Sequence, residues 1–374
     1  MAAEIAESSG QFALDEETPL SGVVMAVQAN FYRVHLDSAT VPADGRDTEI
    51  LLCTRRSRLK KIGQRVMVGD RVQIEEPDWA GGRGAIAAVA PRDSEMNRPA
   101  IANVDHVLLV FALADPPLEP FQLSRFLVKA ESIGVKVTLC LNKRDLLPLQ
   151  EQAEWRDRLW QWGYAPLLIS VHDPESLQTV YPSLQQRTTL VSGPSGVGKS
   201  SLLNQLLPDV DLRVGSVSGK LRHGRHTTRH VELFELPGEG FLADSPGFNQ
   251  PDVDCAPAEL SHFFPEVRQR LAAEHCQFHN CLHRDEPGCV VRGDWERYEH
   301  YLVLLEEAIA RQTALERSRD AESTVKQKIG SDGQIETEPK LESKRYRRPS
   351  RRTQKQALKD LVDLEADDDN EPTP

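Results

Sequence analysis

Residues 193–200 have the types and the spacing of a phosphate-binding loop. They read Gly-Pro-Ser-Gly-Val-Gly-Lys-Ser and match the pattern G-x-x-x-x-G-K-[S/T]. In such a loop the glycines let backbone N–H groups turn inward onto phosphates, the lysine reaches the terminal phosphates, and the serine hydroxyl can bind Mg²⁺. A short apolar run precedes the loop and helical spacing follows it, so the loop should open a helix N-terminus. The expected nucleotide contacts are Gly193, Ser195, Gly196, Val197, Gly198, Lys199, Ser200 and Ser201.

A second motif, Asn142-Lys143-Arg144-Asp145, follows residues 135–141, which read as a buried parallel strand. The Asp145 carboxylate could accept hydrogen bonds from guanine N1 and the exocyclic amine, a pair of donors that adenine does not offer. Asn142 and the stem of Lys143 would hold the ring. Asn-Lys-x-Asp sequences also form turns and helix caps. Beside a phosphate loop, however, the motif predicts selection of guanine over adenine.

A third element, Asp244-Ser245-Pro246-Gly247, comes after a strand-like run. Asp244 could hold Mg²⁺ through water, and the Gly247 N–H could contact the γ-phosphate. Upstream of it, Thr227 and Thr228 offer the hydroxyl that a switch segment uses on the metal. The alternative for these threonines is a solvated polar loop.

Phe248 stands where many GTPases have a water-orienting glutamine. Because its side chain can neither donate nor accept a hydrogen bond, another group must orient the water. His226 is the nearest candidate, as a base or a positioning group, and its alternative is a surface histidine. We therefore expect His226, Lys199 and Thr228 to act in catalysis.

Three cysteines and two histidines gather in residues 276–289. The spacing C-x4-C-x-H-x5-C supplies three sulfurs and one nitrogen, a set that suits a tetrahedral structural zinc ion. Disulfides are the competing interpretation. The chain has only six cysteines in 374 residues and shows no apolar signal segment, which favours a reducing cytosol.

The region before the guanine motif reads as a small β-barrel. Five short apolar runs, separated by Gly, Asp and Pro, suit an OB-fold over residues 21–97. Between Thr54 and Arg71 there are seven basic residues and one acid, Asp70. Such a stripe could follow an RNA backbone, although a basic run is often only a solvated face. Aromatic residues are sparse there, so shape and charge would matter more than base readout.

Strands and helices alternate over residues 98–250, which predicts a doubly wound parallel sheet. Helical spacing returns over residues 295–318. Residues 344–359 then hold eight basic and no acidic residues, and residues 360–374 hold seven acidic and no basic ones. This composition cannot bury a core.

The guanine motif precedes the phosphate loop, the reverse of the usual order, which indicates a circularly permuted GTPase. With the segment Gly224-Arg225-His226-Thr227-Thr228 and the cysteine cluster, the chain resembles the ribosome small-subunit-dependent GTPase family known as RsgA or YjeQ over about residues 20–318. The resemblance implies an OB-fold, a permuted GTPase domain and a zinc domain that act late in small-subunit maturation. It also implies His283, rather than His279, as the imidazole ligand. The implied zinc ligands are Cys276, Cys281, His283 and Cys289.

Composition limits the partners. The chain has 45 basic and 57 acidic residues, a formal net charge of -12, so RNA contacts must come from local patches. Because no apolar run approaches the length of a membrane span, we expect a cytoplasmic protein with no membrane partner. We also expect a monomer that does not bind DNA. The expected partners are the small ribosomal subunit with its rRNA and GTP or GDP, and the expected cofactors are one structural Zn²⁺ and Mg²⁺ bound with GTP.

The sequence thus predicts a multidomain protein. The expected segments are a disordered N-terminus (1–20), an OB-fold RNA-binding domain (21–97), a circularly permuted α/β P-loop GTPase domain (98–250), a helical zinc-binding domain (251–318) and a disordered charged tail (319–374). The leading hypothesis is a GTPase that the small subunit stimulates. The alternative is a GTP-dependent RNA-binding switch whose hydrolysis is incidental. A third class, an ATP-dependent small-molecule kinase, is disfavoured by Asp145.

Overall fold

The computed structural model describes most of the chain in two compact units, residues 1–309 and residues 310–374. The described residues are 19–38, 49–97, 99–207, 231–237, 240–244, 253–322, 325–329 and 335–339. His226, Thr227, Thr228 and Gly247 lie outside these ranges, so their expected roles stay predictions.

The N-terminal strands form a closed five-stranded barrel. They are β1 (Ser21–Gln28), β2 (Phe31–Leu36), β3 (Ile50–Arg55), β4 (Arg71–Asp78) and β5 (Arg83–Val89), with the short helix α1 (Ser57–Lys61) after β3. The order is β1-β2-β3-β5-β4, and a β1–β4 pairing closes it. Only β3 and β5 pair in parallel within the barrel. Alternating side chains fill the interior, and the expected OB-fold is confirmed.

The hairpin β6 (Glu95–Asn97) and β7 (Ala100–Ala102) connects the barrel to an α/β region. Its elements are β8 (His106–Ala112), α2 (Pro120–Glu131), β9 (Lys136–Asn142), the 3₁₀ turn η2 (Arg144–Leu146), α3 (Leu149–Gln161), β10 (Leu167–Leu168), α4 (Pro174–Gln178), α5 (Tyr181–Leu184), β11 (Thr188–Ser192), α6 (Lys199–Leu206), β12 (Glu232–Glu235) and β13 (Phe241–Asp244). The strand order is β10-β9-β8-β11-β13-β12. All neighbours in this part pair in parallel except β12, which is antiparallel to β13.

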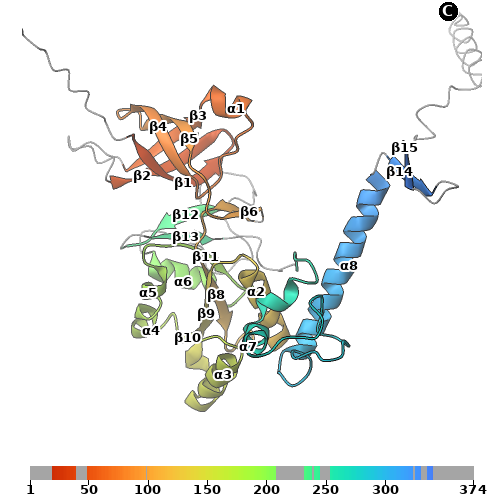
Figure 1. Ribbon diagram of the computed structural model, residues 1–374. Helices are drawn as coiled ribbons and strands as arrows, with labels where there is room; N and C mark the ends of the chain where they lie inside the picture. The colour runs from red at the N-terminus through yellow and green to blue at the C-terminus, as the bar shows by residue number, and fades with distance from the viewer. Residues whose placement is uncertain are drawn as a thin grey trace, which may run out of the picture. The chain divides into compact units, whose positions relative to one another are not determined.

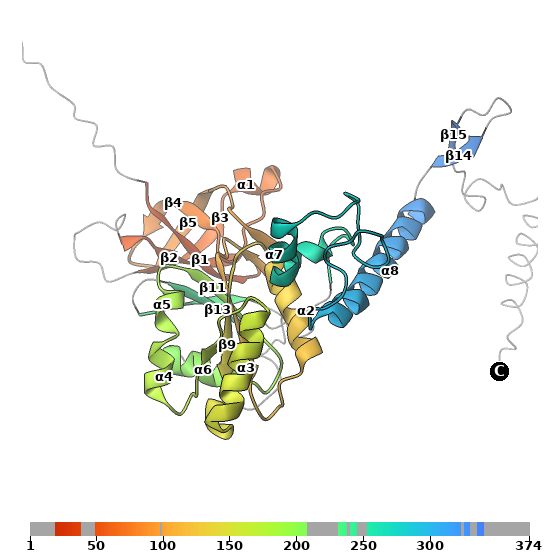
Figure 2. The same ribbon diagram turned by 60° about the horizontal axis from the view of Figure 1, so that its bottom comes forward.

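Both faces of the parallel strands are covered by helices. Every residue of β8 is buried, as expected of a strand with a core on each side. Alternate residues of β8 pack with α2 and α3 on one face and with α4, α5 and α6 on the other. Figure 1 and Figure 2 both show α2 on the opposite side of these strands from α4, α5 and α6. The predicted doubly wound sheet is confirmed.

The barrel and the α/β sheet share one hydrogen-bonded surface. Strand β1 pairs antiparallel with β12, with Ala26 opposite Glu232, so the two parts make a single 11-stranded sheet. An ion pair of 2.6 Å between Arg33 and Glu232 crosses the same boundary. The His35 ring also meets the Phe241 ring edge-on. The barrel is therefore attached to β12 and β13, the two strands that lead into the third motif.

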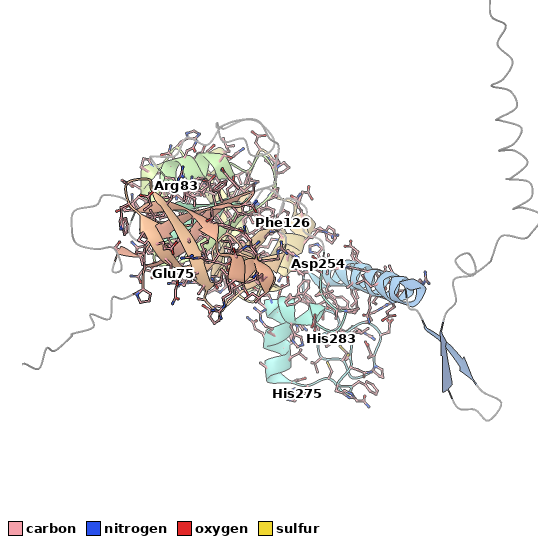
Figure 3. All side chains as sticks on the ribbon, turned by 90° about the horizontal axis from the view of Figure 1, so that it is seen from above. Glu75, Arg83, Phe126, Asp254, His275 and His283 are labelled. Atoms are coloured by element: carbon pink, nitrogen blue, oxygen red, sulfur yellow. The ribbon has the colours of Figure 1, made fainter. Side chains whose placement is uncertain are left out.

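The C-terminal module has its own hydrophobic cluster, into which Val128 of α2 also packs. It contains the 3₁₀ turn η3 (Leu260–Phe263), α7 (Pro265–Ala273) and the long helix α8 (Tyr298–Glu322). Figure 3 shows His283 in the loops that join α7 to α8. Arg297, fully buried, donates to both carboxylate oxygens of Glu266. Its guanidinium lies 4.8 Å from the Trp162 ring centre, which links this module to the residue that ends α3.

Two elements differ from the sequence expectations. The strand expected over 166–171 pairs only at Leu167 and Leu168. Within residues 319–374, where we expected a disordered tail, a hairpin pairs β14 (Val325–Ile329) with β15 (Ile335–Pro339). None of the helices among the described residues has both the length and the apolar character of a membrane span.

Candidate nucleotide-binding and metal sites

The motif residues converge at one edge of the parallel sheet. Strand β9 ends at Asn142, β11 ends at Ser192 just before the phosphate loop, and β13 ends at Asp244. Because these strands run in parallel, their carboxyl ends lie on the same edge, where ligands bind in open α/β sheets. The register confirms this for two of them, since Val191 lies opposite Asp244.

Close backbone approaches explain two glycines of the phosphate loop. Gly193 has φ of +145°, and a Cβ there would lie 1.9 Å from the carbonyl oxygen of Val110. Gly198 has φ of +93°, and a Cβ there would lie 2.3 Å from Nδ2 of Asn142. Both distances are shorter than any van der Waals contact. The loop can therefore hold this conformation only with glycine at these positions.

Asn142 joins the guanine motif to the phosphate loop. Its Nδ2 donates to the Val197 carbonyl over 2.9 Å. Among the residues that the structure describes, its Oδ1 is buried without a hydrogen-bond partner, as is Oγ of Ser192 beside the loop. Buried polar atoms are almost always satisfied. Two orphaned oxygen atoms beside the phosphate loop therefore fit a polar ligand or its bound water.

Lys143 takes the left-handed conformation, with φ of +62°. Its Nζ donates to the carbonyl of Asp115, in the segment that follows β8. The aliphatic stem of Lys143 thus spans between the carboxyl ends of β8 and β9. Such a stem offers an apolar surface on which a planar base can rest. Asp145, next along the motif, is exposed and its carboxylate is accessible to a ligand.

Lys199 is half-buried at the start of α6 and folds back onto its own loop. Its Nζ donates to the carbonyls of Gly193 and Pro194, over 2.8 and 2.6 Å. Burial lowers the pKa of Lys199 below its usual range, and the Asp244 carboxylate partly opposes that shift. A phosphate would offer this ammonium a stronger partner than two neutral carbonyls do.

The other predicted loop residues occupy suitable positions. Ser195 and Gly196 are exposed at the tip of the loop, and Val197 is buried beneath it. Ser200 and Ser201 lie in the first turn of α6, where free N–H groups favour an anion. The structure thus brings together Asn142, the phosphate loop and Asp244.

Sequence reasoning missed other residues at this edge, namely Asp115, Arg144, Asp173 and Ser192. Asp115 and Ser192 gave no sequence signal. Arg144 occupies the variable position of the motif. Asp173 does carry a sequence signal, because Asp followed by Pro174 is a helix-start pattern.

The four predicted metal ligands form a compact cluster. The ligand atoms of Cys276, Cys281, His283 and Cys289 all lie within 4.8 Å of one another. Nδ1 of His283 lies 3.6 Å from Sγ of Cys276 and 3.4 Å from Sγ of Cys289. All six cysteines are free, so the disulfide alternative is wrong. His279 is not part of the cluster.

Neighbouring groups hold this cluster in place. Glu286 accepts backbone N–H groups on both sides of His283, from Leu282 at 2.7 Å and from Arg284 at 2.8 Å. The Tyr298 hydroxyl donates to the His283 carbonyl over 2.9 Å. Burial lowers the pKa of His283, and Glu286 partly opposes this. A neutral imidazole is the form that binds metal. Three thiols and one imidazole can hold a metal ion with four protein ligands.

The basic stripe of the barrel is centred on α1. Arg58, Lys60, Lys61, Arg65 and Arg71 are exposed. Leu59, on the other side of α1, is buried in the barrel core. Arg56 is partly neutralised by ion pairs with Glu75 at 3.1 Å and Glu76 at 2.7 Å. The other exposed basic side chains give this part of the barrel a cationic surface that suits a polyanion.

A parallel sheet with a phosphate loop after β11 and a guanine motif after β9, earlier in the chain, defines a circularly permuted P-loop GTPase. Comparison with known proteins agrees. The family model for the RsgA GTPase matches residues 89–254. The Small ribosomal subunit biogenesis GTPase RsgA of Trichormus variabilis is 61% identical over 361 residues, covering 92% of this chain and 98% of that protein. The protein of the same name from Synechocystis sp. is 52% identical over 358 residues, covering 91% and 95%.

Two solved structures are also similar. YjeQ from Thermotoga maritima has a TM-score of 0.66 at 28% identity, covering 79% of this chain and 100% of that one. YloQ, described as a circularly permuted GTPase, has a TM-score of 0.64 at 28% identity, covering 79% and 98%. The chain belongs to the RsgA family of GTPases and is a GTP-hydrolysing enzyme.

Proposed function

We propose that this GTPase acts in late maturation of the small ribosomal subunit, which stimulates its hydrolysis of GTP to GDP and phosphate. The relatives named above are described as small ribosomal subunit biogenesis GTPases, and they match this chain over nearly its whole length. It would work as a monomer in the cytoplasm, with rRNA rather than DNA as its nucleic-acid partner.

The contact between Asn142 and Val197 carries the nucleotide part of the proposal. It fixes the guanine motif against the phosphate loop, so one ligand can contact both. In this arrangement Asp145 would accept hydrogen bonds from the base, and Asn142 and Lys143 would hold the ring. Backbone N–H groups of residues 193–201 would bind the phosphates together with Lys199.

Mg²⁺ bound with GTP would neutralise charge on the phosphates. Ser200 and Asp244 would hold it, with Thr227 or Thr228. The pairing of β11 with β13 supports this assignment, because Asp244 lies opposite Val191, just before the phosphate loop. His226 would position the attacking water, and Gly247 would contact the γ-phosphate.

The cysteine cluster would hold one structural Zn²⁺ through Cys276, Cys281, His283 and Cys289. Its donor set, three sulfurs and one nitrogen, is typical of closed zinc sites. With four protein ligands no position is left for a substrate. The exposed basic residues around α1 would contact the rRNA backbone, and screening by salt should weaken that contact.

A second candidate function is an RNA-binding switch whose GTP hydrolysis is incidental. Phe248 favours it, because a glutamine that orients water is absent at that position. The two functions differ in whether the small subunit accelerates turnover.

Steady-state GTP hydrolysis by the purified protein, with and without small ribosomal subunits, tests the proposal. Large subunits and ATP are the controls. We expect stimulation only with GTP and the small subunit, and equal slow turnover in every mixture would favour the switch. His226→Ala should lower stimulated hydrolysis but leave GTP binding intact. Unchanged turnover in that variant would remove His226 from the mechanism.

A further inference from the structure

Arg144, the variable third residue of the guanine motif, reaches across to the next loop of the sheet edge. Its Nη2 donates to Oδ2 of Asp173 over 2.5 Å, and its Nη1 lies 3.4 Å from the Leu168 carbonyl. Leu168 ends β10, and Asp173 is the cap of α4. One guanidinium therefore connects the segment after β9 with the segment after β10.

Asp173 is held from its other side as well. Its Oδ1 accepts the backbone N–H of Glu175 over 3.2 Å and caps α4. One carboxylate oxygen thus serves the helix while the other serves Arg144. Burial opposes ionisation of Asp173, but the hydrogen bonds from Arg144 and the backbone outweigh it, so its pKa lies below the usual range. The carboxylate has a fixed orientation.

The loop between β10 and α4 is closed by a second set of contacts. Ser176 Oγ accepts the Ser170 N–H over 3.0 Å and lies 2.7 Å from the Asp173 carbonyl. The backbone N–H of Arg144 donates to the Ile169 carbonyl over 3.1 Å. Residues 169–173 are therefore tied both to themselves and to the guanine motif.

These contacts bear on the proposed nucleotide site, because Asp145 directly follows Arg144. A guanine that meets the Asp145 carboxylate at the sheet edge would lie between that residue and the loop of residues 170–172. The separation of the two segments decides whether the carboxylate can meet N1 and the exocyclic amine together. An error of about 1 Å would weaken both hydrogen bonds.

We propose that Arg144 and Asp173 are positioning residues that set guanine specificity by fixing the guanine motif relative to the loop after β10. This rests on the proposed guanine site above. An ordinary surface ion pair would have no such effect. Arg156 and Asp157, adjacent and exposed on α3 at 3.4 Å, form such a pair and serve as the matched control.

The test measures the dissociation constants of GDP and of IDP, which lacks the exocyclic amine, for the full-length protein and its variants. Arg144→Ala and Asp173→Asn both break the pair, and asparagine can still cap α4. We expect GDP binding to weaken by about fivefold, the upper range for a partly exposed pair. IDP keeps N1–H and lacks only the amine, so its binding should weaken less than that of GDP, and the preference for GDP over IDP should narrow. The value of kcat at saturating GTP should stay the same.

The double variant separates a shared role from two independent ones. If the residues act as a unit, combining Arg144→Ala with Asp173→Asn should weaken GDP binding no further than either change alone. Arg156→Ala should match the wild type. A fall in melting temperature with an unchanged GDP-to-IDP ratio would assign the pair to stability alone and overturn the inference, as would additive losses. A wild-type protein that bound ADP as well as GDP would instead overturn the guanine site itself.

Discussion

Asn142 Nδ2 donates to the Val197 carbonyl over 2.9 Å and connects two motifs that lie 55 residues apart in the chain. The contact has a simple origin, since β9 and β11 are parallel strands of one sheet and both end at the same edge. Circular permutation changes the order of the motifs along the chain but leaves this edge intact. The guanine motif and the phosphate loop therefore meet as neighbours in space.

Asn142→Asp should weaken GDP binding by about 30-fold, as expected when about 2 kcal/mol is lost at a buried hydrogen bond. A carboxylate cannot donate to the Val197 carbonyl, and it would place negative charge beside the phosphate loop. Titration with a fluorescent GDP analogue measures the effect. Gln312→Glu, the same chemical change at an exposed position of α8, is the control. Equal affinity in Asn142→Asp and the wild type would contradict the role of this contact.

Gly198→Ala should abolish measurable GDP binding, because the new methyl group would lie 2.3 Å from Asn142 Nδ2. The variant also places alanine at positive φ, which costs about 1–2 kcal/mol anywhere. Gly63→Ala isolates this second effect, since Gly63 has φ of +70° and nothing within 4 Å of the added carbon. Calorimetric titration should show normal GDP binding for Gly63→Ala. Similar losses in the two variants would mean that backbone strain, not contact with Asn142, explains the result.

Sequence patterns predicted the fold well where one element determines its own structure. Short apolar runs separated by Gly, Asp and Pro predicted all five barrel strands. The glycine pattern also predicted the phosphate loop and the start of α6 after it. The edge that collects Asn142, Gly198 and Asp244 also followed from the parallel arrangement. The residue at which β10 ends could not be predicted, because the apolar run of residues 166–171 does not show where strand pairing stops. Ile169 still donates to the Leu141 carbonyl, but the chain then turns into the loop that Ser176 closes.

Contacts between elements were harder to foresee. The pairing of β1 with β12 joins the barrel to the GTPase sheet, yet no residue of either strand signals it. The pairing of Arg144 with Asp173 likewise depends on where two loops lie in space. An exposed charged side chain can pair with a residue on any neighbouring segment, so local sequence spacing does not predict which residue is its partner.

Glu266→Gln should destabilise the protein by about 3 kcal/mol. Arg297 is fully buried against this carboxylate, and the neutral amide would leave its charge uncompensated among the rings of Trp162 and Phe264. Urea unfolding monitored by tryptophan fluorescence measures the loss. Asp157→Asn, which removes the exposed partner of Arg156, should change the free energy of unfolding by less than about 0.5 kcal/mol. A comparable effect in both variants would show that burial of the pair is unimportant.

Glu286→Gln should lower zinc affinity by about tenfold, the range seen when groups that orient metal ligands are lost. Burial opposes the charge of Glu286, but the N–H donors of Leu282 and Arg284 outweigh it and depress its pKa to about 2. Because the carboxyl pKa is depressed in the folded protein, the ionised Glu286 stabilises the folded loop at pH values above its pKa in the unfolded chain, near 4.5. This stabilisation is lost as the pH falls toward 2. Glu286→Gln should therefore lack this stabilisation of the loop at neutral pH.

Competition with a chromophoric chelator measures the zinc affinity of Glu286→Gln at pH 7. Asp285→Asn removes the same charge from an exposed neighbour in the same turn and should bind zinc as the wild type does. If both variants lost affinity equally, the loss would reflect net charge near the cluster. A loss confined to Glu286→Gln would instead identify the contacts of the Glu286 carboxylate as the cause, namely its hydrogen bonds to the backbone N–H groups around His283 and to Cys281.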